Sequence, residues 1–273
     1  MDKDFKKIVE LALLEDIGPG DLSASLLDNV IINAEIICRD NAVICGIEYF
    51  DLCFLTLDPE IQITWNTEDG FEVISGEVVC SILGKSQAII TAERTALNFL
   101  QILSGTATKT RHLVSLINHT KAQLLDTRKT LPGLRKAQKF AVKCGGGVNH
   151  RMGLYDCIML KENHIFSIGS LHQAIKKALK HYPNVAIVVE DETLEQLQLA
   201  LSIKGITRVL CDNFSIDELK KAVQMSKTIY PLEASGGINE GNIVNYAETG
   251  VDYISIGSVT KDVMAVDLSL RFS

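Results

Sequence analysis

The second half of the sequence alternates between short apolar segments and longer amphipathic ones. From residue 122 onward, the segments typical of β-strands are AQLLD, YDCIMLK, VAIVVE, TRVLCD, YPLEA and DYISIG. Helical patterns lie between them, at about 20 to 35 residues per unit. This alternation favours parallel strands with crossover helices, arranged as a barrel or as an open doubly wound sheet. No GxGxxG motif follows a strand, which disfavours the dinucleotide-binding form of the open sheet.

Polar residues and glycines occur where these apolar segments end. In an α/β barrel such positions all open on one face, the C-terminal mouth, where active sites are built. Counting a further segment near 147–150, we expect seven strands and therefore an incomplete α/β barrel. The positions at the strand ends are Asp126, Arg128, Lys161, Glu190, Asp212, Glu233, Ser235 and Gly257.

The first hundred residues follow a different pattern. A charged amphipathic helix is expected over 5–15, and short apolar segments separated by turns follow over 31–90, with a helix at 48–55 between them. This mixture predicts a small α+β layer. A long helical stretch over 91–117, interrupted at Gly105, is expected to connect this layer to the barrel.

The final segment, VDLSLRFS, is expected to return as a strand to the N-terminal layer. The predicted domains are an N-terminal α/β sandwich over 1–105, joined by a C-terminal strand over 264–273, and a catalytic barrel over 106–263. With 47% hydrophobic residues among 273, the chain is long enough to bury such cores.

A cationic segment lies inside an acidic chain. The whole protein carries a formal charge of −7, whereas residues 126–164 contain eight lysines and arginines against three acidic residues, a balance of +5. Nucleic-acid binding usually requires a basic domain, so this segment is more typical of a cleft that collects small anions. Lys136, Lys139 and Lys143, spaced three and four apart, are most simply a solvated helix face.

The seven cysteines are odd in number and show neither a CxxC pair nor Cys/His metal spacing. Most lie in apolar runs, so we interpret them as reduced core residues of a cytoplasmic protein, Cys144 beside the glycine run included.

The first 18 residues lack the apolar core of a signal peptide. No segment approaches the roughly 18 to 20 apolar residues that span a bilayer. Export and membrane insertion are therefore not expected.

Two glycine-rich turns follow the last two strands, ASGGI at 234–238 and SIGSVT at 255–260. Backbone amides at such turns bind phosphate, and the last two strand loops are the usual phosphate site of these barrels.

Glu190 and Asp212 end adjacent strands, so their carboxylates suit a hard cation or the hydroxyls of a sugar. Alternatively, one of them forms an ion pair with Lys161 inside the barrel.

The expected mouth also contains an excess of cations. Arginine matches carboxylates in a planar fork, whereas lysine supplies a point charge for phosphate, so the ligand should carry negative charges of both kinds. His150 alone would more often be a core histidine, but its place after GGGVN favours a functional role. The cationic positions are Arg128, Lys129, His150, Arg151 and Lys161.

Several motifs together resemble one enzyme family over nearly the full chain. DTRKT and GGGVNHR are the most specific, and they are accompanied by ERTALNFLQILSG, PGLR, LKENH, LCDNF, EASGGI, AETGVDYISIG and EDIGPGD. This set is similar to that of quinolinate phosphoribosyltransferase, also called nicotinate-nucleotide pyrophosphorylase (carboxylating). The resemblance implies a sandwich domain, an incomplete barrel and assembly at least as a homodimer. It also implies that quinolinate and phosphoribosyl pyrophosphate react, with Mg²⁺, to give nicotinate mononucleotide, pyrophosphate and CO₂ in NAD synthesis.

The resemblance also implies roles for individual residues. The two carboxylates of quinolinate would be held by Arg128, His150, Arg151 and Lys161, with Arg94 donated by the neighbouring subunit. Lys129 would face the pyrophosphate and the reacting centre. The ribose hydroxyls and the metal would be served by Glu190 and Asp212. The 5′-phosphate would be held by Ser235, Gly236, Gly237 and Gly257.

Two positions depart from the family pattern. Val188 stands where the family often has a second glutamate, which would thin the shell around the metal or the ribose. Lys261 stands where many members have a histidine, and its role is open.

Two other functions compete with this one. The first is a transferase of the same fold with another acceptor, such as nicotinate. The second is a non-catalytic barrel that binds phosphorylated metabolites. Two carboxylates require more cationic partners than one, which favours quinolinate, and a sensor has no need for Lys129, Glu190 and Asp212 together.

Overall fold

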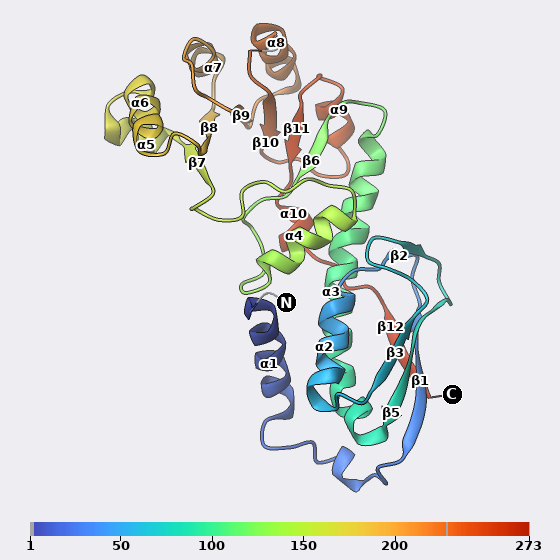
Figure 1. Ribbon diagram of the computed structural model, residues 1–273. Coiled ribbons are helices and arrows are strands. Elements are labelled where there is room, and N and C mark those ends of the chain that lie inside the picture. Colours follow the sequence, from blue (N-terminus) through green and yellow to red (C-terminus); the bar gives the residue numbers. More distant parts are fainter. Residues whose placement is uncertain (1–2, 228, 273) are drawn as a thin grey trace. The chain divides into compact units, whose positions relative to one another are not determined.

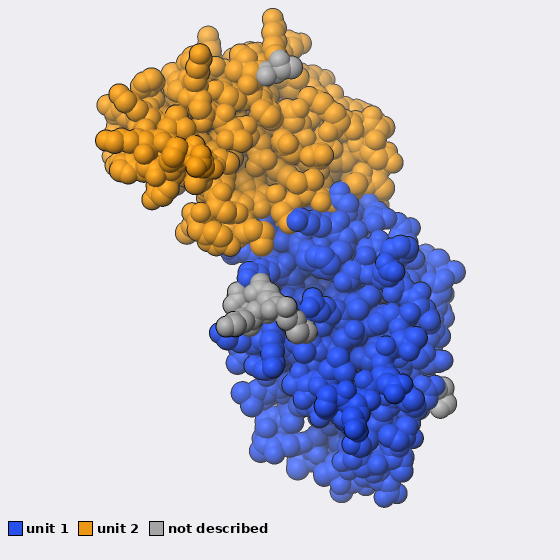
Figure 2. Space-filling view, viewed as in Figure 1, with its two compact units in different colours: residues 1–111, 132–146, 262–273 blue, residues 112–131, 147–261 orange. Residues whose placement is uncertain are grey.

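The computed structural model describes residues 3–227 and 229–272, and the chain divides into two compact units (Figures 1 and 2). The first unit contains residues 1–111, 132–146 and 262–273, and the second contains residues 112–131 and 147–261. The segment 132–146, which the sequence placed with the barrel, thus belongs to the first unit.

The first unit contains a four-stranded antiparallel sheet in the order β12-β1-β5-β3. Burial alternates along the end of β1, where Ala34, Ile36 and Cys38 are buried, as expected for a strand with one face on a core. The C-terminal strand pairs with β1, with Ala34 opposite Phe272, so the predicted return to the N-terminal layer is confirmed. The strands are β1 (Ile31–Cys38), β3 (Gln62–Trp65), β5 (Val78–Lys85) and β12 (Leu268–Phe272).

Helices cover this sheet. Phe50 and Phe54 of α2 are fully buried together with Ile36 and Ile82 of the sheet, so apolar burial holds the helix on the strands. The predicted helix at 48–55 is confirmed. The remaining elements of the unit are α1 (Lys3–Ile17), η1 (Ala24–Leu26), α2 (Ile47–Leu57), α4 (Arg135–Cys144) and the short pair β2 (Ala42–Val43) and β4 (Glu72–Val73).

The long helix α3 (Ser86–Ile117) runs through Gly105 without a break, so the predicted glycine interruption is wrong. A Cβ atom on Gly105 would lie only 2.0 Å from the carbonyl oxygen of Met264. The glycine therefore permits close approach of another backbone segment, and the hydrogen bonds of the surrounding helix override its weak propensity.

The second unit contains a six-stranded parallel sheet in the order β6-β11-β10-β9-β8-β7. The predicted seventh strand is reduced to a single parallel bridge between Leu125 and Val148. This arrangement agrees with the predicted incomplete barrel. The strands are β6 (Gln123–Leu125), β7 (Cys157–Leu160), β8 (Ala186–Asp191), β9 (Arg208–Asp212), β10 (Leu232–Ser235) and β11 (Tyr253–Ser255).

Helices connect the strands of this sheet. The boundaries have clear chemical causes, since Ser170, Thr193 and Ser215 each accept a hydrogen bond from a backbone N–H of the first turn that follows. The helices are α5 (Glu162–Ile168), α6 (Leu171–His181), α7 (Leu194–Leu201), α8 (Ile216–Ser226), α9 (Ile243–Ala247) and α10 (Ser258–Lys261).

The interpretation of three lysines of α4 as one solvated face is wrong for Lys139. Lys136 and Lys143 are exposed, but Lys139 has no exposed surface. The three positions lie on one side of the helix, but helical spacing does not show which of them a neighbouring segment covers. Across residues 3–227 and 229–272, no helix is long and apolar enough to cross a membrane.

Candidate active site

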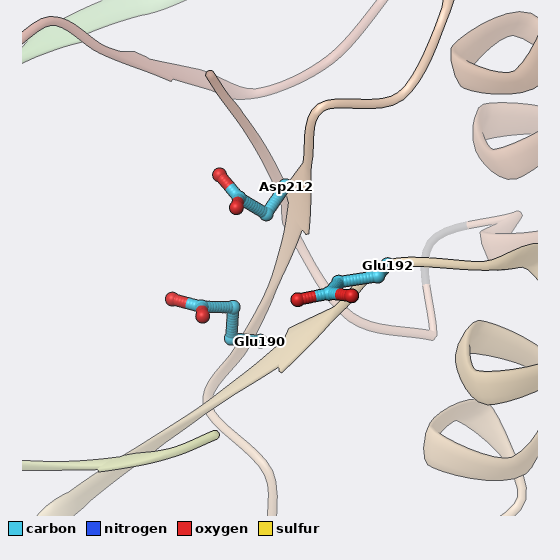
Figure 3. Close-up of side chains that lie close together, drawn as sticks. All are labelled: Glu190, Glu192 and Asp212. Atoms are coloured by element: carbon cyan, nitrogen blue, oxygen red, sulfur yellow. The ribbon is translucent and has the colours of Figure 1, made fainter. Parts of the chain in front are cut away.

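An acidic cluster lies at the ends of β8 and β9. Glu190, Glu192 and Asp212 each offer a carboxylate oxygen, and the three oxygens lie within 4.8 Å of one another (Figure 3). The structure therefore brings the predicted pair Glu190 and Asp212 together. Glu192 was not predicted from the sequence, although its spacing of two from Glu190 places it on the same side of the extended chain.

Val188 precedes Glu190 by two residues on the same strand, but it lies in an apolar cluster. This cluster contains Cys157, Val188 and Leu210, with Met159 packed against it. An acidic side chain at residue 188 would be buried there, because Val188 is only 2% exposed. In this chain the third carboxylate of the cluster comes from Glu192, after the end of the strand, and Val188 closes the apolar layer.

Asn213 fixes the position of Asp212 and of the neighbouring loop. Its side-chain amide donates to Asp212 Oδ2 at 2.9 Å, and its backbone N–H donates to the carbonyl oxygen of Ser235 at 2.8 Å. Asn213 has a φ of 58°, in the left-handed region that asparagine tolerates better than most residues. The LCDNF motif held this residue, but only the structure shows its contact with the SGG loop.

Lys161 forms an ion pair with Glu190. The alternative in which one carboxylate pairs with Lys161 is therefore realised for Glu190. Lys161 also stands directly before α5, and its backbone N–H donates to His164 Nδ1 at 3.1 Å. The lysine side chain is 46% exposed and that of Glu190 is 13% exposed, so the ion pair lies at the boundary between sheet and solvent.

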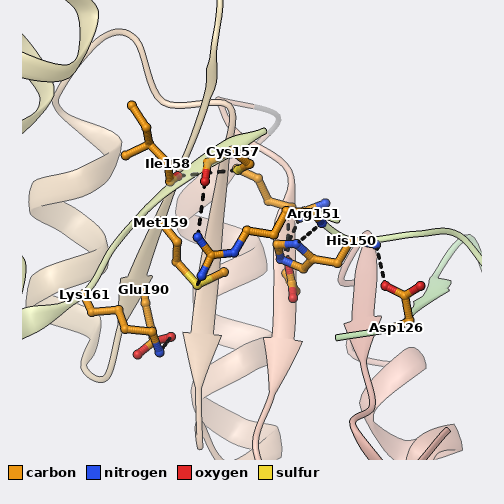
Figure 4. A network of polar contacts seen from close by, with 10 residues as sticks. Asp126, His150, Arg151, Cys157, Ile158, Met159, Lys161 and Glu190 are labelled. Carbon is orange, nitrogen blue, oxygen red and sulfur yellow. Dashed lines mark hydrogen bonds and ion pairs between the residues drawn. The ribbon is translucent and has the colours of Figure 1, made fainter. Parts of the chain in front are cut away.

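Two arginines lie close to each other near these carboxylates. Burial lowers the pKa of Arg151, and the positive charge of Arg128 lowers it further. The Arg151 guanidinium donates to the carbonyl oxygen of Cys157 at 3.2 Å and lies 3.6 Å from the sulfur of Met159 (Figure 4). Asp156 and Glu190 offset its charge in part, but two arginines side by side still favour an anionic ligand.

Asp126 anchors the loop that carries these groups. Its side chain is fully buried and accepts from the backbone N–H of His150 at 2.8 Å and from the Asn149 amide at 2.6 Å (Figure 4). Hydrogen bonds to a carboxylate are stronger than those between neutral groups, so Asp126 holds residues 149–150 in place. The aspartate thus has a structural role at the site.

His150 lies inside the sheet and contacts two charged residues that the sequence did not indicate as partners. Its Nε2 lies 3.1 Å from Arg208 Nη2 and 3.4 Å from Glu233 Oε2. Arg208 Nε lies 2.8 Å from the same glutamate oxygen. Arg208 begins strand β9, where its segment TRVLCD was identified as a strand without any role for the arginine.

The glycine-rich loop after β10 has the backbone geometry of an anion-binding turn. Gly236 and Gly237 have φ values of 100° and 62°. A Cβ atom on Gly236 would lie 2.1 Å from Asn213 Oδ1, whereas one on Gly237 would meet nothing within 4 Å. Gly236 is thus required by both conformation and space, and Gly237 by conformation.

Lys129 lies against the second glycine turn. A Cβ atom on Gly257 would lie 2.8 Å from Lys129 Cδ, and the Thr260 hydroxyl donates to the carbonyl oxygen of Lys129 at 2.8 Å. The structure therefore brings the lysine of DTRKT to the SIGSVT turn. Lys261 is exposed in α10, four residues after Gly257.

The predicted site residues except Arg94 lie in the second unit. Arg94 is an exposed residue of α3 in the first unit. Within the second unit, the cationic residues, the acidic cluster and the glycine turns all stand at or after the ends of parallel strands. Such a set can hold a carboxylated molecule and a phosphorylated molecule, and it can bind a hard cation through oxygen ligands.

Comparison with known proteins identifies relatives over nearly the whole chain. The models of the quinolinate phosphoribosyl transferase N-terminal and C-terminal domains match residues 21–104 and 106–271. The probable nicotinate-nucleotide pyrophosphorylase (carboxylating) of Bacillus subtilis is 39% identical over 268 residues, which cover 97% of this chain and 92% of that protein. A nicotinate-nucleotide pyrophosphorylase (carboxylating) of Mycobacterium leprae is 37% identical, with 96% and 95% covered.

Solved structures agree with these relatives. The nicotinate-nucleotide pyrophosphorylase from Francisella tularensis matches with a TM-score of 0.98 at 43% identity, covering 100% of this chain and 97% of that chain. This agreement extends to both units, because the match leaves no part of the chain uncovered.

Proposed function

Since the chain belongs to the quinolinate phosphoribosyltransferase family, we propose that it transfers the phosphoribosyl group of phosphoribosyl pyrophosphate to quinolinate, with loss of CO₂. The products are nicotinate mononucleotide, pyrophosphate and CO₂, in NAD biosynthesis. The observation that carries this assignment to particular residues is the proximity of Arg128 and Arg151, because two neighbouring guanidinium groups suit a ligand with two carboxylates.

The acceptor pocket is assigned to the cationic residues of the second unit. Arg128 and Arg151 bind the carboxylates of quinolinate in the planar geometry that guanidinium groups favour. Lys161 is within reach of the same region and exchanges its ion pair with Glu190 for a substrate carboxylate. His150 borders the pocket beside Arg151.

The phosphoribosyl donor is assigned to the two glycine turns. Ser235, Gly236 and Gly237 bind the 5′-phosphate through backbone N–H groups, and Gly257 completes this site. Lys129, whose side chain lies over Gly257, faces the pyrophosphate and the reacting centre. A lysine is suited to this place because it offers a compact positive charge to phosphate oxygens.

The acidic cluster fits Mg²⁺ by the chemistry of its donors. Glu190, Glu192 and Asp212 supply carboxylate oxygens, the ligands that this hard cation prefers, and their exposure leaves room for water and substrate oxygens. When bound, the ion supplies positive charge to the pyrophosphate leaving group. The same carboxylates accept hydrogen bonds from the ribose hydroxyls.

The charges of the site match those that develop in the reaction. As the bond from C1 to pyrophosphate breaks, the ribose becomes positive and the leaving group becomes negative. Glu190 and Asp212 then stabilise the ribose, and Lys129 stabilises the pyrophosphate. Loss of CO₂ leaves an electron pair at C2 of the pyridine ring, and the cationic ring nitrogen accommodates that charge until a proton from solvent adds at C2.

The assembly and the location of the protein are part of this proposal. We assign a homodimer, or a higher homo-oligomer, in which Arg94 of one subunit completes the acceptor pocket of another. The exposure of Arg94 on α3 supports this assignment. A cytoplasmic location is supported by the seven cysteines, which are all free thiols, six of them buried.

The proposed reaction is tested with purified protein, Mg²⁺, phosphoribosyl pyrophosphate and either quinolinate or nicotinate. CO₂, pyrophosphate and the mononucleotide are measured in the same samples. Product from quinolinate alone, in equal amounts of the three species, is the expected result. Equal rates with nicotinate would contradict the two-carboxylate pocket, and binding of phosphoribosyl pyrophosphate without product would favour a non-catalytic sensor.

A further inference from the structure

Two neighbouring strands direct charged side chains at the ring of His150. Arg208 comes from β9 and Glu233 from β10, and both lie against Nε2, whereas Nδ1 faces the backbone of Arg151. On its other side, the Arg208 guanidinium lies 4.8 Å from the centre of the Tyr253 ring of β11, at the distance of a cation–π contact.

Both nitrogens of the His150 ring have partners. Nδ1 accepts from the backbone N–H of Arg151 at 2.6 Å. Nε2 lies 3.1 Å from Arg208 Nη2 and 3.4 Å from Glu233 Oε2. The arginine can only donate and the carboxylate can only accept, so these two contacts favour opposite protonation states of Nε2. Together they hold in place the ring whose other nitrogen binds the Arg151 backbone.

Arg208 keeps the glutamate ionised. Glu233 has no exposed surface, and burial by itself raises the pKa of its carboxyl group. The hydrogen bond from His150 and the charge of Arg208 outweigh burial, so the pKa of Glu233 is below its ordinary value. Arg208 Nε lies 2.8 Å from the oxygen that faces His150, so arginine and histidine share one acceptor.

Stability alone does not explain this cluster. Burying an ion pair costs desolvation energy that is often not recovered, and apolar residues of similar size are commonly as stable in such places. The neighbouring interior layer of Cys157, Val188 and Leu210 is indeed apolar. The charged pair contacts His150, which in turn binds the Arg151 backbone beside the proposed acceptor pocket. Its position therefore indicates a role in that pocket.

We propose that Arg208 and Glu233 are positioning residues of the acceptor pocket, which hold the His150 ring in place and thereby fix Arg151 for binding the dicarboxylate. The pair acts on the acceptor side only, through the Glu233–His150–Arg151 chain of contacts. This inference rests on the proposed function, since it assumes that Arg151 binds quinolinate.

The test compares the substrate affinities of Glu233→Gln, Glu233→Asp and Arg208→Lys with those of the unchanged protein. Glu248→Gln is the matched control, because Glu248 forms an exposed ion pair with His119. The dissociation constants of quinolinate and of phosphoribosyl pyrophosphate are measured separately by calorimetry. The ¹⁵N resonances of the His150 ring, assigned with a His150→Gln sample, report changes in the surroundings of its two nitrogens.

Glu233→Gln should weaken quinolinate binding by about tenfold, as expected when a buried charged partner is removed, and leave phosphoribosyl pyrophosphate binding within about twofold. The His150 resonances should shift, because Nε2 loses its anionic neighbour. Glu233→Asp, which keeps the charge, should recover part of the affinity. Arg208→Lys should also weaken quinolinate binding, because lysine lacks the planar guanidinium group that contacts both His150 and Glu233.

An unchanged quinolinate affinity with unchanged His150 resonances would overturn the inference. Equal weakening of both substrates would also overturn it, since a merely structural defect is not confined to the acceptor. If Glu233→Gln does not fold, the affinities of Arg208→Lys for the two substrates are compared instead. Failure of the unchanged protein to bind quinolinate would instead contradict the proposed function.

Discussion

Glu192 and Val188 stand two residues on either side of Glu190, and only Glu192 offers a ligand to the acidic cluster. The carboxylates of Glu190, Glu192 and Asp212 lie within 4.8 Å of one another, whereas Val188 is packed among apolar side chains. At the scale of single residues, the third carboxylate of this site thus comes from residue 192, after Glu190, and not from residue 188, before it.

Glu192→Gln should therefore raise the Mg²⁺ concentration needed for half-maximal activity, by about tenfold, because a neutral amide binds a hard cation less strongly than a carboxylate. The measurement is a Mg²⁺ titration of the initial rate at saturating substrates. Glu195→Gln is the control, since Glu195 is exposed three residues further on, at the start of α7. A Mg²⁺ dependence equal to that of the control would exclude Glu192 from the metal site.

Gly236→Ala should lower kcat/KM for phosphoribosyl pyrophosphate by about tenfold or more, because the loop must move from the geometry that binds phosphate. The added Cβ would lie 2.1 Å from Asn213 Oδ1, at a φ of 100°. Gly237→Ala is the comparison, since its Cβ meets nothing within 4 Å and its φ is 62°. Equal kinetic effects of the two variants would contradict the role given to the Asn213 contact.

At the scale of elements, α3 shows how a contact outside a helix can reverse a propensity. Replacing glycine by alanine inside a helix ordinarily stabilises it by about 1 kcal/mol. Gly105→Ala should instead destabilise the protein by about 1 to 3 kcal/mol, because its Cβ would overlap the Met264 carbonyl. Denaturant unfolding measures this change. An unchanged or raised stability would contradict this prediction. It would mean that the 262–273 segment can move away from the added methyl group with little loss of folding free energy.

The packing of α2 on β3 contains a carboxyl group that should make stability depend on pH. Trp65 Nε1 donates to Asp51 Oδ1 at 2.8 Å. Burial raises the pKa of Asp51 to about 6, although the Trp65 hydrogen bond lowers it and nearby acidic groups raise it. Between pH 4 and pH 6 the folded state then binds more protons than the unfolded state, so stability falls as pH rises through this range.

Asp51→Asn should remove this part of the pH dependence while keeping an acceptor for Trp65. Relative to the unchanged protein, the variant should become more stable from about pH 4 to about pH 6, with no further gain above that range. Trp65 is the single tryptophan of the chain, so its fluorescence follows unfolding at each pH. A constant difference between the two proteins from pH 4 to pH 7 would refute the raised pKa.

At the scale of the whole molecule, the proposed site needs residues of two subunits. Arg94→Ala and Lys161→Ala should each abolish turnover, and subunit exchange between the two variants should restore about a quarter of the normal activity. This fraction follows because half of randomly mixed dimers are heterodimers, each with one intact site. Native mass spectrometry of differently tagged subunits verifies the exchange. No recovery after exchange would show that each site is built from one chain.

Much of the architecture was predictable from local patterns. Apolar alternation and turn residues predicted the parallel strands, the helix at 48–55 and the return of the C-terminal strand, and the strand-end positions predicted the pairing of Glu190 with Asp212. These features depend on the chemical nature and spacing of nearby residues, which the sequence contains directly. The motifs DTRKT and GGGVNHR were enough to indicate the family, because their spacing is specific.

Other features depended on contacts between residues far apart in the chain. The continuity of α3 through Gly105, the burial of Lys139 and the approach of Asn213 to Gly236 could not be read from periodicity, because each depends on which segment packs nearby. The same is true of Arg208 and Glu233, which meet His150 only when β9 and β10 pair beside the loop that carries it. The sequence alone determined the kinds of element and the family of the site, since these follow from local chemistry, and the tertiary structure decided which charges are buried together, since burial depends on the packing of distant segments.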